Sequence, residues 1–294
     1  MSIRALALDA IVERVMSRGG KQGVIAEIAR RHADGAPAPA PVPASVAKRF
    51  VVGEARVAGS RVVTLRRREA PPGRAVVFLP GGGYAHPVST AHWIAVAQYA
   101  LAAGIDAVVP LYEVVPVGDA ARAHGFVAQV LDETIAERGA EQVYLAGDSA
   151  GGGLALSVLQ RRPEGIRAAV LLNPWLDVEL AHPAVPALER WDVILDPAEL
   201  RLWGRAWAGD LSTSDPAVSP LHGGFSGLPP VHVVTGGRDA LLTQALDAHR
   251  LLRLAGNAGT LAYSPDVNHA VGLMRSATPE AKRAFDHVVH ILRS

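Results

Sequence analysis

Short apolar runs alternate with longer helical segments through most of this 294-residue chain, and the alternation limits the folds open to it. The runs are residues 75–79, 106–109, 142–146, 168–172, 231–235 and 260–263. The helical segments are 90–103, 118–138, 150–162, 240–255 and 278–293. This order is typical of a mostly parallel sheet that is covered by helices on both faces.

The chain divides into a small N-terminal piece and a main body. Residues 1–34 have apolar residues at helical spacing, and a Pro-Ala tract at 35–45 follows them. We therefore predict an N-terminal helical cap segment and linker over 1–45, and a main domain over 46–294. The main domain opens with "RFVVGEARVAGSRVVTLRRRE", which predicts an antiparallel hairpin.

One interval breaks the alternation. About sixty residues separate the runs at 168 and 231, and within them Asp196, followed by Pro197 and Glu199, predicts the start of a helix. This helix carries Trp203 and Trp207. We interpret residues 180–215 as an insertion that lies over the strand ends.

Composition excludes several classes of protein. The 29 basic and 28 acidic residues nearly balance, so nothing favours a nucleic-acid partner. No cysteine is present, which excludes disulfides, thiolate metal sites and a cysteine nucleophile. No apolar run approaches the roughly 20 residues that a membrane helix needs. Charged residues interrupt the N-terminal apolar stretch, so we expect no signal peptide and a cytoplasmic location.

The stretch "YLAGDSAGGGLAL" contains a G-x-S-x-G pentapeptide between an apolar run and a helical segment. A strand-to-helix turn of this kind needs small residues on both sides of the serine and exposes its hydroxyl at the carboxyl edge of the sheet. Ser149 is therefore the candidate nucleophile. The alternative is a glycine-rich helix start that only packs closely on a strand.

A serine hydroxyl needs a base to take its proton and an acid to orient that base, and on this fold both follow the serine in the chain. Asp239 comes directly after the run at 231–235 and its glycines, and His269 comes after the run at 260–263. Asp266 is the rival acid.

His86 and His92, after the second glycine cluster, are the rival bases. If His269 is the base, replacing either rival should leave most of the activity.

That second cluster, "FLPGGGYAHP", follows the first central strand. Its glycines allow backbone N–H groups to converge on one oxygen, and Gly82, Gly83 and the N–H of Ala150 would form an oxyanion hole. A phosphate-binding loop is the competing function, but the Lys-Ser/Thr ending of such loops is missing. A flexible turn is the remaining alternative.

Together these motifs resemble the hormone-sensitive-lipase-like branch of the α/β-hydrolases, which is rich in bacterial carboxylesterases. The resemblance covers roughly residues 50–290 and rests on "GGGY", "GDSAGG", "NPWLDV", "SPL", "GLPPVHVVTGGRDAL" and the "NH" at 268–269. It implies an α/β-hydrolase fold, with a mostly parallel eight-stranded sheet, helices on both faces and a helical cap. One departure concerns Pro80, which stands where the family usually has a histidine that anchors the glycine loop.

The resemblance implies a serine carboxylesterase that acts on small-molecule esters with short acyl chains, with lactones as a further class. It implies no cofactor and no metal. We assign substrate contact to Tyr84, Trp203 and Trp207; the two tryptophans would roof the pocket, unless they only pack the insertion against the body. The alternatives are a small-molecule receptor that keeps the pocket without hydrolysis and, less favoured, a peptidase. A homodimer is an open option.

Overall fold

Eight strands form a single sheet in the computed structural model of this chain. The structure describes residues 26, 30–31, 33–35, 37–68, 73–269, 273 and 278–294. Most of the predicted cap segment 1–34 lies outside these residues. In sheet order the strands run β1-β2-β4-β3-β5-β6-β7-β8. Their bounds are β1 Phe50–Val57, β2 Ser60–Arg67, β3 Ala75–Leu79, β4 Asp106–Pro110, β5 Val143–Asp148, β6 Ile166–Leu172, β7 Val231–Arg238 and β8 Leu261–Asn268.

The strands from β4 to β8 are parallel, and the first two form the predicted antiparallel hairpin. Val57 pairs with Ser60 across a two-residue turn, in which Ala58 and Gly59 both have positive φ. Such a turn matches the twist of the paired strands. The predicted α/β-hydrolase fold with a mostly parallel eight-stranded sheet is confirmed.

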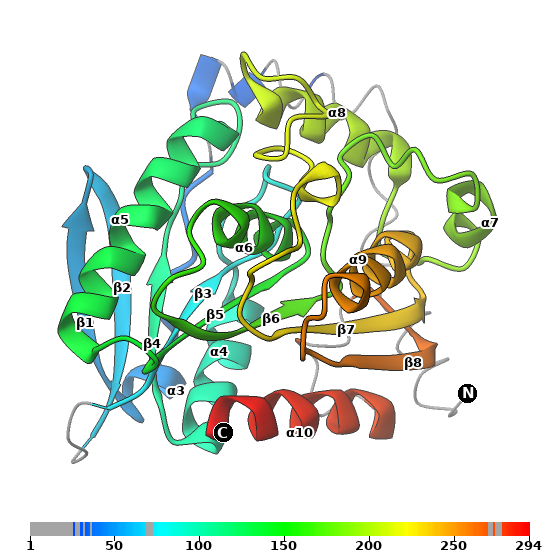
Figure 1. Cartoon of the computed structure of the whole chain (residues 1–294). Helices are drawn as coiled ribbons and strands as arrows, with labels where there is room; N and C mark the ends of the chain where they lie inside the picture. Colours follow the sequence, from blue (N-terminus) through cyan, green and yellow to red (C-terminus); the bar gives the residue numbers. More distant parts are fainter. Residues whose placement is uncertain are drawn as a thin grey trace.

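Helices cover both faces of the sheet (Figure 1). Helices α5, α6 and α9 pack on one face, and α4 and α10 pack on the other. The main helices are α4 Thr90–Ala103, α5 Ala120–Arg138, α6 Ala150–Arg161, α8 Pro197–Ala208, α9 Leu242–Leu254 and α10 Pro279–Arg293. Three shorter elements are α3 Ala44–Ala47, α7 Val185–Glu189 and the 3₁₀ turn η1 Pro220–His222.

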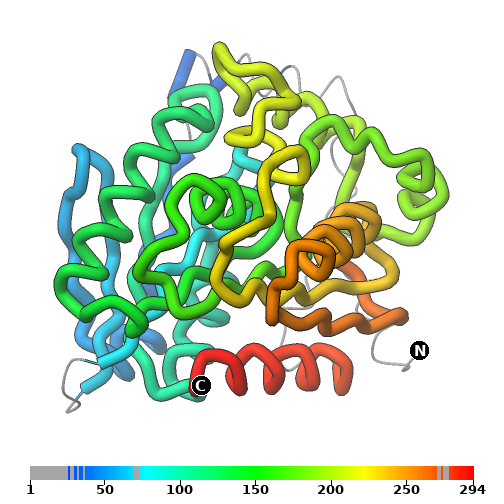
Figure 2. Tube along the Cα trace, viewed as in Figure 1, coloured from blue at the N-terminus to red at the C-terminus, as the bar shows by residue number. Residues whose placement is uncertain are grey.

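Alternate residues of each buried strand enter the two separate cores, as a period of two requires. In β3, Val77 and Leu79 join the core under α5 and α6, whereas Val76 and Phe78 join the core over α4 and α10. Because both faces are buried, the central strands are apolar along most of their length. The tube in Figure 2 follows this sandwich of helix, sheet and helix along the chain.

The Pro-Ala tract leads into the sheet along a fixed path. Residues 37–43 have no regular secondary structure, and the last two residues of the tract, Ala44 and Ser45, begin α3. Ala40 donates its N–H to Val88 O at 2.9 Å and accepts from the Trp93 indole at 2.8 Å. The tract is therefore fastened to the segment that links the second glycine cluster to α4.

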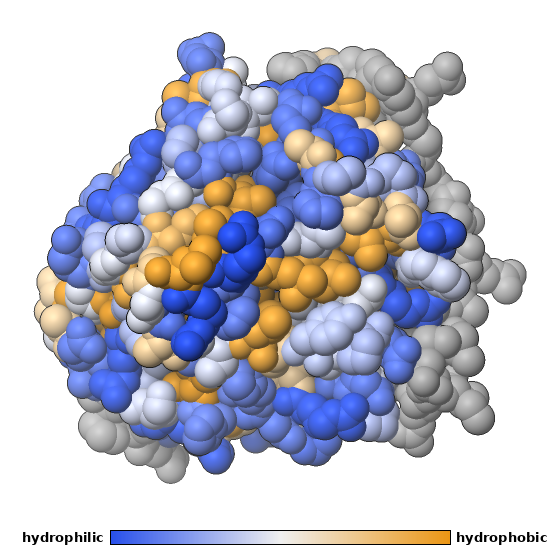
Figure 3. Space-filling view, turned by 45° about the vertical axis from the view of Figure 1, so that its right-hand side comes forward, coloured by the Kyte–Doolittle hydropathy of each residue, from blue (hydrophilic) through white to orange (hydrophobic). Residues whose placement is uncertain are grey.

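Helix α8 belongs to the predicted insertion and begins as expected, because the Asp196 carboxylate accepts the N–H groups of Ala198 and Glu199. It lies at the top of the view in Figure 1 and contacts the loop that follows β3. On the face in Figure 3, apolar patches are interrupted by hydrophilic residues. None of the described helices combines the length and the apolar character that a bilayer crossing requires.

Candidate active site

Ser149 lies at a sharp turn between β5 and α6, with φ 52° and ψ −123°. A non-glycine residue with positive φ is uncommon and is held there only by its surroundings. The Ser149 N–H donates to Leu172 O at 2.8 Å, and its carbonyl accepts from Gly153 N and Trp175 N. These backbone bonds hold the turn and present the hydroxyl at the carboxyl edge of the sheet.

The flanking glycines have no room for a side chain. A Cβ at Gly147 would lie 2.3 Å from Gly151 O, and a Cβ at Gly151 would lie 2.0 Å from Leu79 O. The glycines of the pentapeptide therefore allow β3, β5 and α6 to approach closely around the serine.

The three predicted catalytic side chains meet in one hydrogen-bonded row. The His269 Nε2 is 2.9 Å from the Ser149 Oγ, and the His269 Nδ1 is 3.1 Å from the Asp239 Oδ2. Asp239 directly follows β7, and His269 directly follows β8. All three side chains are buried. With its proton on Nδ1, the imidazole donates to the carboxylate and accepts from the serine hydroxyl, which is the arrangement that a general base needs.

Asp239 is held by donors that sequence reasoning did not find. The Asn173 Nδ2 donates to Asp239 Oδ2 at 2.7 Å, and Leu241 N donates to Oδ1 at 2.8 Å. Asn173 follows β6, so it reaches Asp239 from the neighbouring strand end. The stretch "NPWLDV" was part of the family resemblance, but nothing in it pointed to a partner 66 residues away.

Asp192 is a second acid near the triad that sequence reasoning missed. Its Oδ2 accepts from Ala240 N at 2.7 Å, which ties the insertion to the residue after Asp239. Burial and the neighbouring charge of Asp239 raise the pKa of Asp192 to about 6. No motif marks this residue in the sequence.

The charges around His269 decide its protonation. Burial alone lowers the pKa of His269, but the charge and hydrogen bond of Asp239 and the charges of Asp192 and Asp148 outweigh burial. The pKa of His269 is therefore raised above its ordinary value of 6.5.

This raised pKa predicts a specific pH profile. His269 can act as a base only when neutral, and a raised pKa keeps it protonated to higher pH. We expect kcat/KM to fall on acidification with a midpoint above 6.5. Asp192→Asn removes one of the charges that raise the pKa of His269, so the midpoint of this variant should lie lower than that of the wild type.

The control is Asp286→Asn on α10, an exposed residue that pairs with Lys282. A midpoint below 6.5 in the wild type, or equal shifts in both variants, would contradict this account.

The second glycine cluster runs alongside the nucleophile. A Cβ at Gly81 would lie 3.0 Å from Ser149 Cβ, and Gly82 and Gly83 have φ of 124° and 61°. A side chain at Gly82 would collide with His86 O. Consecutive residues with positive φ turn backbone N–H groups toward one concave side. The loop therefore lies beside Ser149 in a backbone conformation that glycine adopts readily, and the convergence of the Gly82, Gly83 and Ala150 N–H groups on one oxygen stays a prediction.

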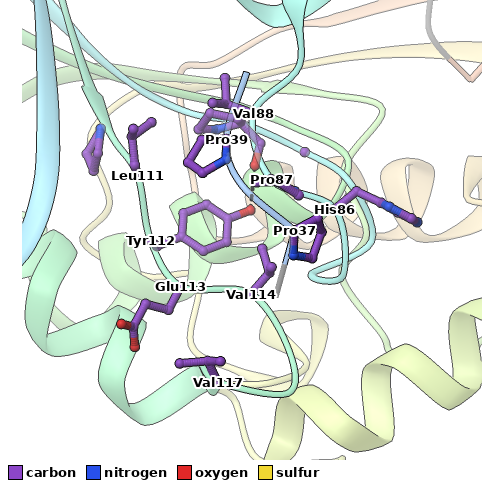
Figure 4. Close-up of a pocket in the computed structure, with 13 residues that line it drawn as sticks. Pro37, Pro39, His86, Pro87, Val88, Leu111, Tyr112, Glu113, Val114 and Val117 are labelled. Carbon is purple, nitrogen blue, oxygen red and sulfur yellow. Dashed lines mark hydrogen bonds between the residues drawn. The ribbon is translucent and has the colours of Figure 1, made fainter. Parts of the chain in front are cut away.

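A cavity of about 250 Å³ borders the same loop at Pro80 and Gly81 (Figure 4). Its lining includes Pro37 and Pro39 of the Pro-Ala tract and Tyr112 after β4. The Tyr112 hydroxyl donates to Pro80 O. The loop thus lies between the nucleophile and an open space.

The residues assigned to substrate contact are packed together. The rings of Tyr84 and Trp207 stack at 4.1 Å and are fully buried. Trp203 is buried beneath the Arg31 guanidinium, which lies 5.0 Å from its ring centre. Tyr84 and Trp207 therefore join α8 to the loop after β3, and contact of Tyr84, Trp203 and Trp207 with the substrate stays a prediction.

The rival residues occupy other positions. His92 contacts Ser89 and Asp148, whereas the exposed His86 has its ring edge against Trp203. Asp266 lies within β8. Within the described part of the chain, no group of three or more histidine, aspartate and glutamate side chains is placed to hold a metal ion.

Comparisons with known proteins identify the family and the relatives of this chain. A family model described as an alpha/beta hydrolase fold matches residues 76–273. An acetyl-hydrolase of Streptomyces hygroscopicus is 30% identical over 76% of this chain and 76% of its own length. A triacylglycerol lipase of Mycobacterium tuberculosis is 36% identical over 60% of this chain, and the match spans 37% of that lipase. A crystal structure of an esterase from the bacterial hormone-sensitive lipase family has a TM-score of 0.83 at 21% identity and covers 100% of this chain and 98% of its own.

Proposed function

We propose that this chain, which belongs to the hormone-sensitive-lipase-like branch of the α/β-hydrolases, is a serine carboxylesterase. The observation that carries the proposal is the row of hydrogen bonds from Ser149 through His269 to Asp239. The names of the relatives support ester hydrolysis as the reaction. The substrate is a small-molecule ester.

The reaction follows from the roles that the geometry allows. Ser149 Oγ attacks the ester carbonyl while His269 Nε2 takes its proton, and the carbonyl oxygen becomes an oxyanion that the N–H groups of Gly82, Gly83 and Ala150 stabilise. The imidazolium, stabilised by Asp239, returns the proton to the leaving alcohol. Water then attacks the acyl-enzyme with the same base, which releases the acid and restores the serine.

The chain is expected to prefer short acyl groups, because α8 limits the space above the loop of Gly81, Gly82 and Gly83, here called the oxyanion loop. Leu200 Cδ2 lies 3.6 Å from the position of a Cβ on Gly83. Kinetics on nitrophenyl esters from acetyl to decanoyl test both the reaction and the preference, and kcat/KM should be highest for acetyl or butyryl. Leu200→Ala should move the optimum toward longer chains, since it removes apolar volume at this point.

Three outcomes of this series would count against the proposal. Faster turnover of decanoyl than of butyryl ester would refute the short-chain preference. An unchanged optimum in Leu200→Ala would refute its structural cause. Tight binding of a small molecule without any turnover would favour a receptor over an esterase.

A further inference from the structure

A chain of polar contacts reaches the oxyanion loop from helix α4. Asp148 directly precedes the nucleophile and is buried. Its Oδ1 accepts from Gly81 N at 2.9 Å, and its Oδ2 is 3.3 Å from His92 Nε2. A single carboxylate thus joins the first glycine of the loop to a histidine of α4.

The capping residues of α4 fix how His92 is protonated. The backbone N–H of Ser89 donates to His92 Nδ1 at 3.0 Å, and Ser89 Oγ is 2.8 Å from the same atom. Because a backbone N–H can only donate, Nδ1 must be the acceptor. The proton therefore lies on Nε2, which donates to Asp148. Helices commonly have Glu or Gln at this third position of a capping box, and a histidine there is unusual.

Beyond Gly81 the loop is also held at Tyr84, whose carbonyl accepts from Val115 N at 2.9 Å. Pro80 has no N–H to donate and stands where the family resemblance places an anchoring histidine. Its carbonyl is held by the Tyr112 hydroxyl, and the cavity lies next to Pro80 and Gly81 (Figure 4). The Gly81 bond to Asp148 joins the start of the loop directly to the residue before the nucleophile.

Asp148 and Gly81 are so closely packed that neither can move without the other. A Cβ on Gly81 would lie 2.4 Å from Asp148 Oδ2 and 2.7 Å from its carbonyl oxygen. A carboxylate that turned away from His92 would move Gly81, and the N–H groups of Gly82 and Gly83 would move with it. Misplaced oxyanion donors weaken the stabilisation of the transition state much more than the binding of the substrate.

The pair also matters electrostatically. Burial lowers the pKa of His92, but the charge of Asp148 and its hydrogen bond outweigh burial and raise it. Asp148 is a buried negative charge beside a loop that must receive another negative charge during the reaction. The His92 Nε2 hydrogen bond to Asp148 Oδ2 stabilises the negative charge of Asp148 on the oxygen that does not bond to Gly81.

We propose that His92 is a positioning residue for the oxyanion loop and acts through Asp148 on Gly81. This inference rests on the proposed esterase function, and it changes the expectation from the sequence that His92 is dispensable. His92 would therefore affect the rate of acyl transfer without contacting the substrate.

Three substitutions separate this role from helix capping. Gln at position 92 can accept from Ser89 N with Oε1 and donate to Asp148 with Nε2, so His92→Gln should retain most of the rate. His92→Glu keeps the capping acceptor, but it loses the donor and places a second carboxylate beside Asp148. His92→Ala loses both contacts. We expect kcat to fall at least about 10-fold in the Ala and Glu variants, with KM little changed, given that loss of one whole oxyanion donor costs about 10² to 10³.

The measurements are kcat and KM on butyryl nitrophenyl ester, and the rate at which a fluorophosphonate probe labels Ser149. Labelling needs the nucleophile, the base and the oxyanion hole but no ester turnover. If the wild type labels and hydrolyses no ester, the esterase proposal fails while the labelling rates still test His92. Should His92→Ala not fold, the comparison of Gln with Glu carries the test. Equal labelling rates for the wild type and the Glu variant, a loss confined to KM, or an equal loss in Gln and Glu would overturn the role of His92.

Discussion

Ser149→Ala is expected to lower kcat for ester hydrolysis by roughly 10⁶, as removal of the nucleophile from a triad does. The hydroxyl is the only group in the row that can form the acyl-enzyme, and His269 cannot replace it. Binding and the oxyanion donors would leave a residual rate of about 10³ to 10⁴ over water. The measurement is kcat and KM on butyryl nitrophenyl ester.

The same variant should keep the fold, because the turn is held by backbone groups. Ser149 N and O bond to Leu172, Gly153 and Trp175 whatever the side chain. Its thermal unfolding midpoint should therefore match that of the wild type.

A matched control is available on α6, the helix that follows Ser149. Ser157 is also buried and also lies against a histidine, with its Oγ 2.7 Å from His124 Nε2. Ser157→Ala should keep wild-type kcat, since this pair lies away from the strand ends. A kcat of Ser149→Ala close to that of the wild type would remove Ser149 from the mechanism.

Much of the fold could be predicted because local patterns specify it. The predicted range 90–103 agrees with α4, and the range 75–79 agrees with β3. The periodicity of apolar residues predicts which helices and strands form. The right-handed crossover between parallel strands then limits the order of the strands in the sheet. The short α3 and α7 were not predicted, since four or five residues carry no measurable period.

The site was predictable only in part, for a different physical reason. Ser149, Asp239 and His269 follow strands of one parallel sheet, so chain order alone brings them to one edge. Asn173, Asp192 and His92 reach their partners from other elements, across 48 to 66 residues. Such contacts depend on side-chain packing, which no local pattern encodes. Tyr84 and Trp207 show another limit of sequence patterns. Large aromatic residues suit a core as well as a substrate pocket, and here the two rings stack on each other.

Asp239→Asn is expected to lower kcat by roughly 10⁴, the cost that the same change has in another triad. Among the described residues, three donors hydrogen-bond to this carboxylate: Asn173 Nδ2 and His269 Nδ1 reach Oδ2, and Leu241 N reaches Oδ1. Only an anion accepts from all three.

An amide must place its NH₂ against one set of these donors. If the amide oxygen faces Leu241, the NH₂ faces His269 Nδ1, and the imidazole must then carry its proton on Nε2, where it cannot accept from Ser149. If the oxygen faces His269, the NH₂ opposes Leu241 N and leaves a buried donor unpaired. In both orientations the negative charge that stabilises the imidazolium is lost.

The pH profile distinguishes this loss from simple misfolding. Removing the charge of Asp239 removes the main contribution that raises the pKa of His269, so the acidic limb of kcat/KM should move to lower pH. The control is Asp266→Asn, which changes the rival acid on β8 and should keep both the rate and the limb of the wild type. A large loss of rate in Asp266→Asn together with a small loss in Asp239→Asn would transfer the role of the acid to Asp266. An unshifted acidic limb in a folded Asp239→Asn variant with a lowered rate would mean that this carboxylate does not raise the pKa of His269.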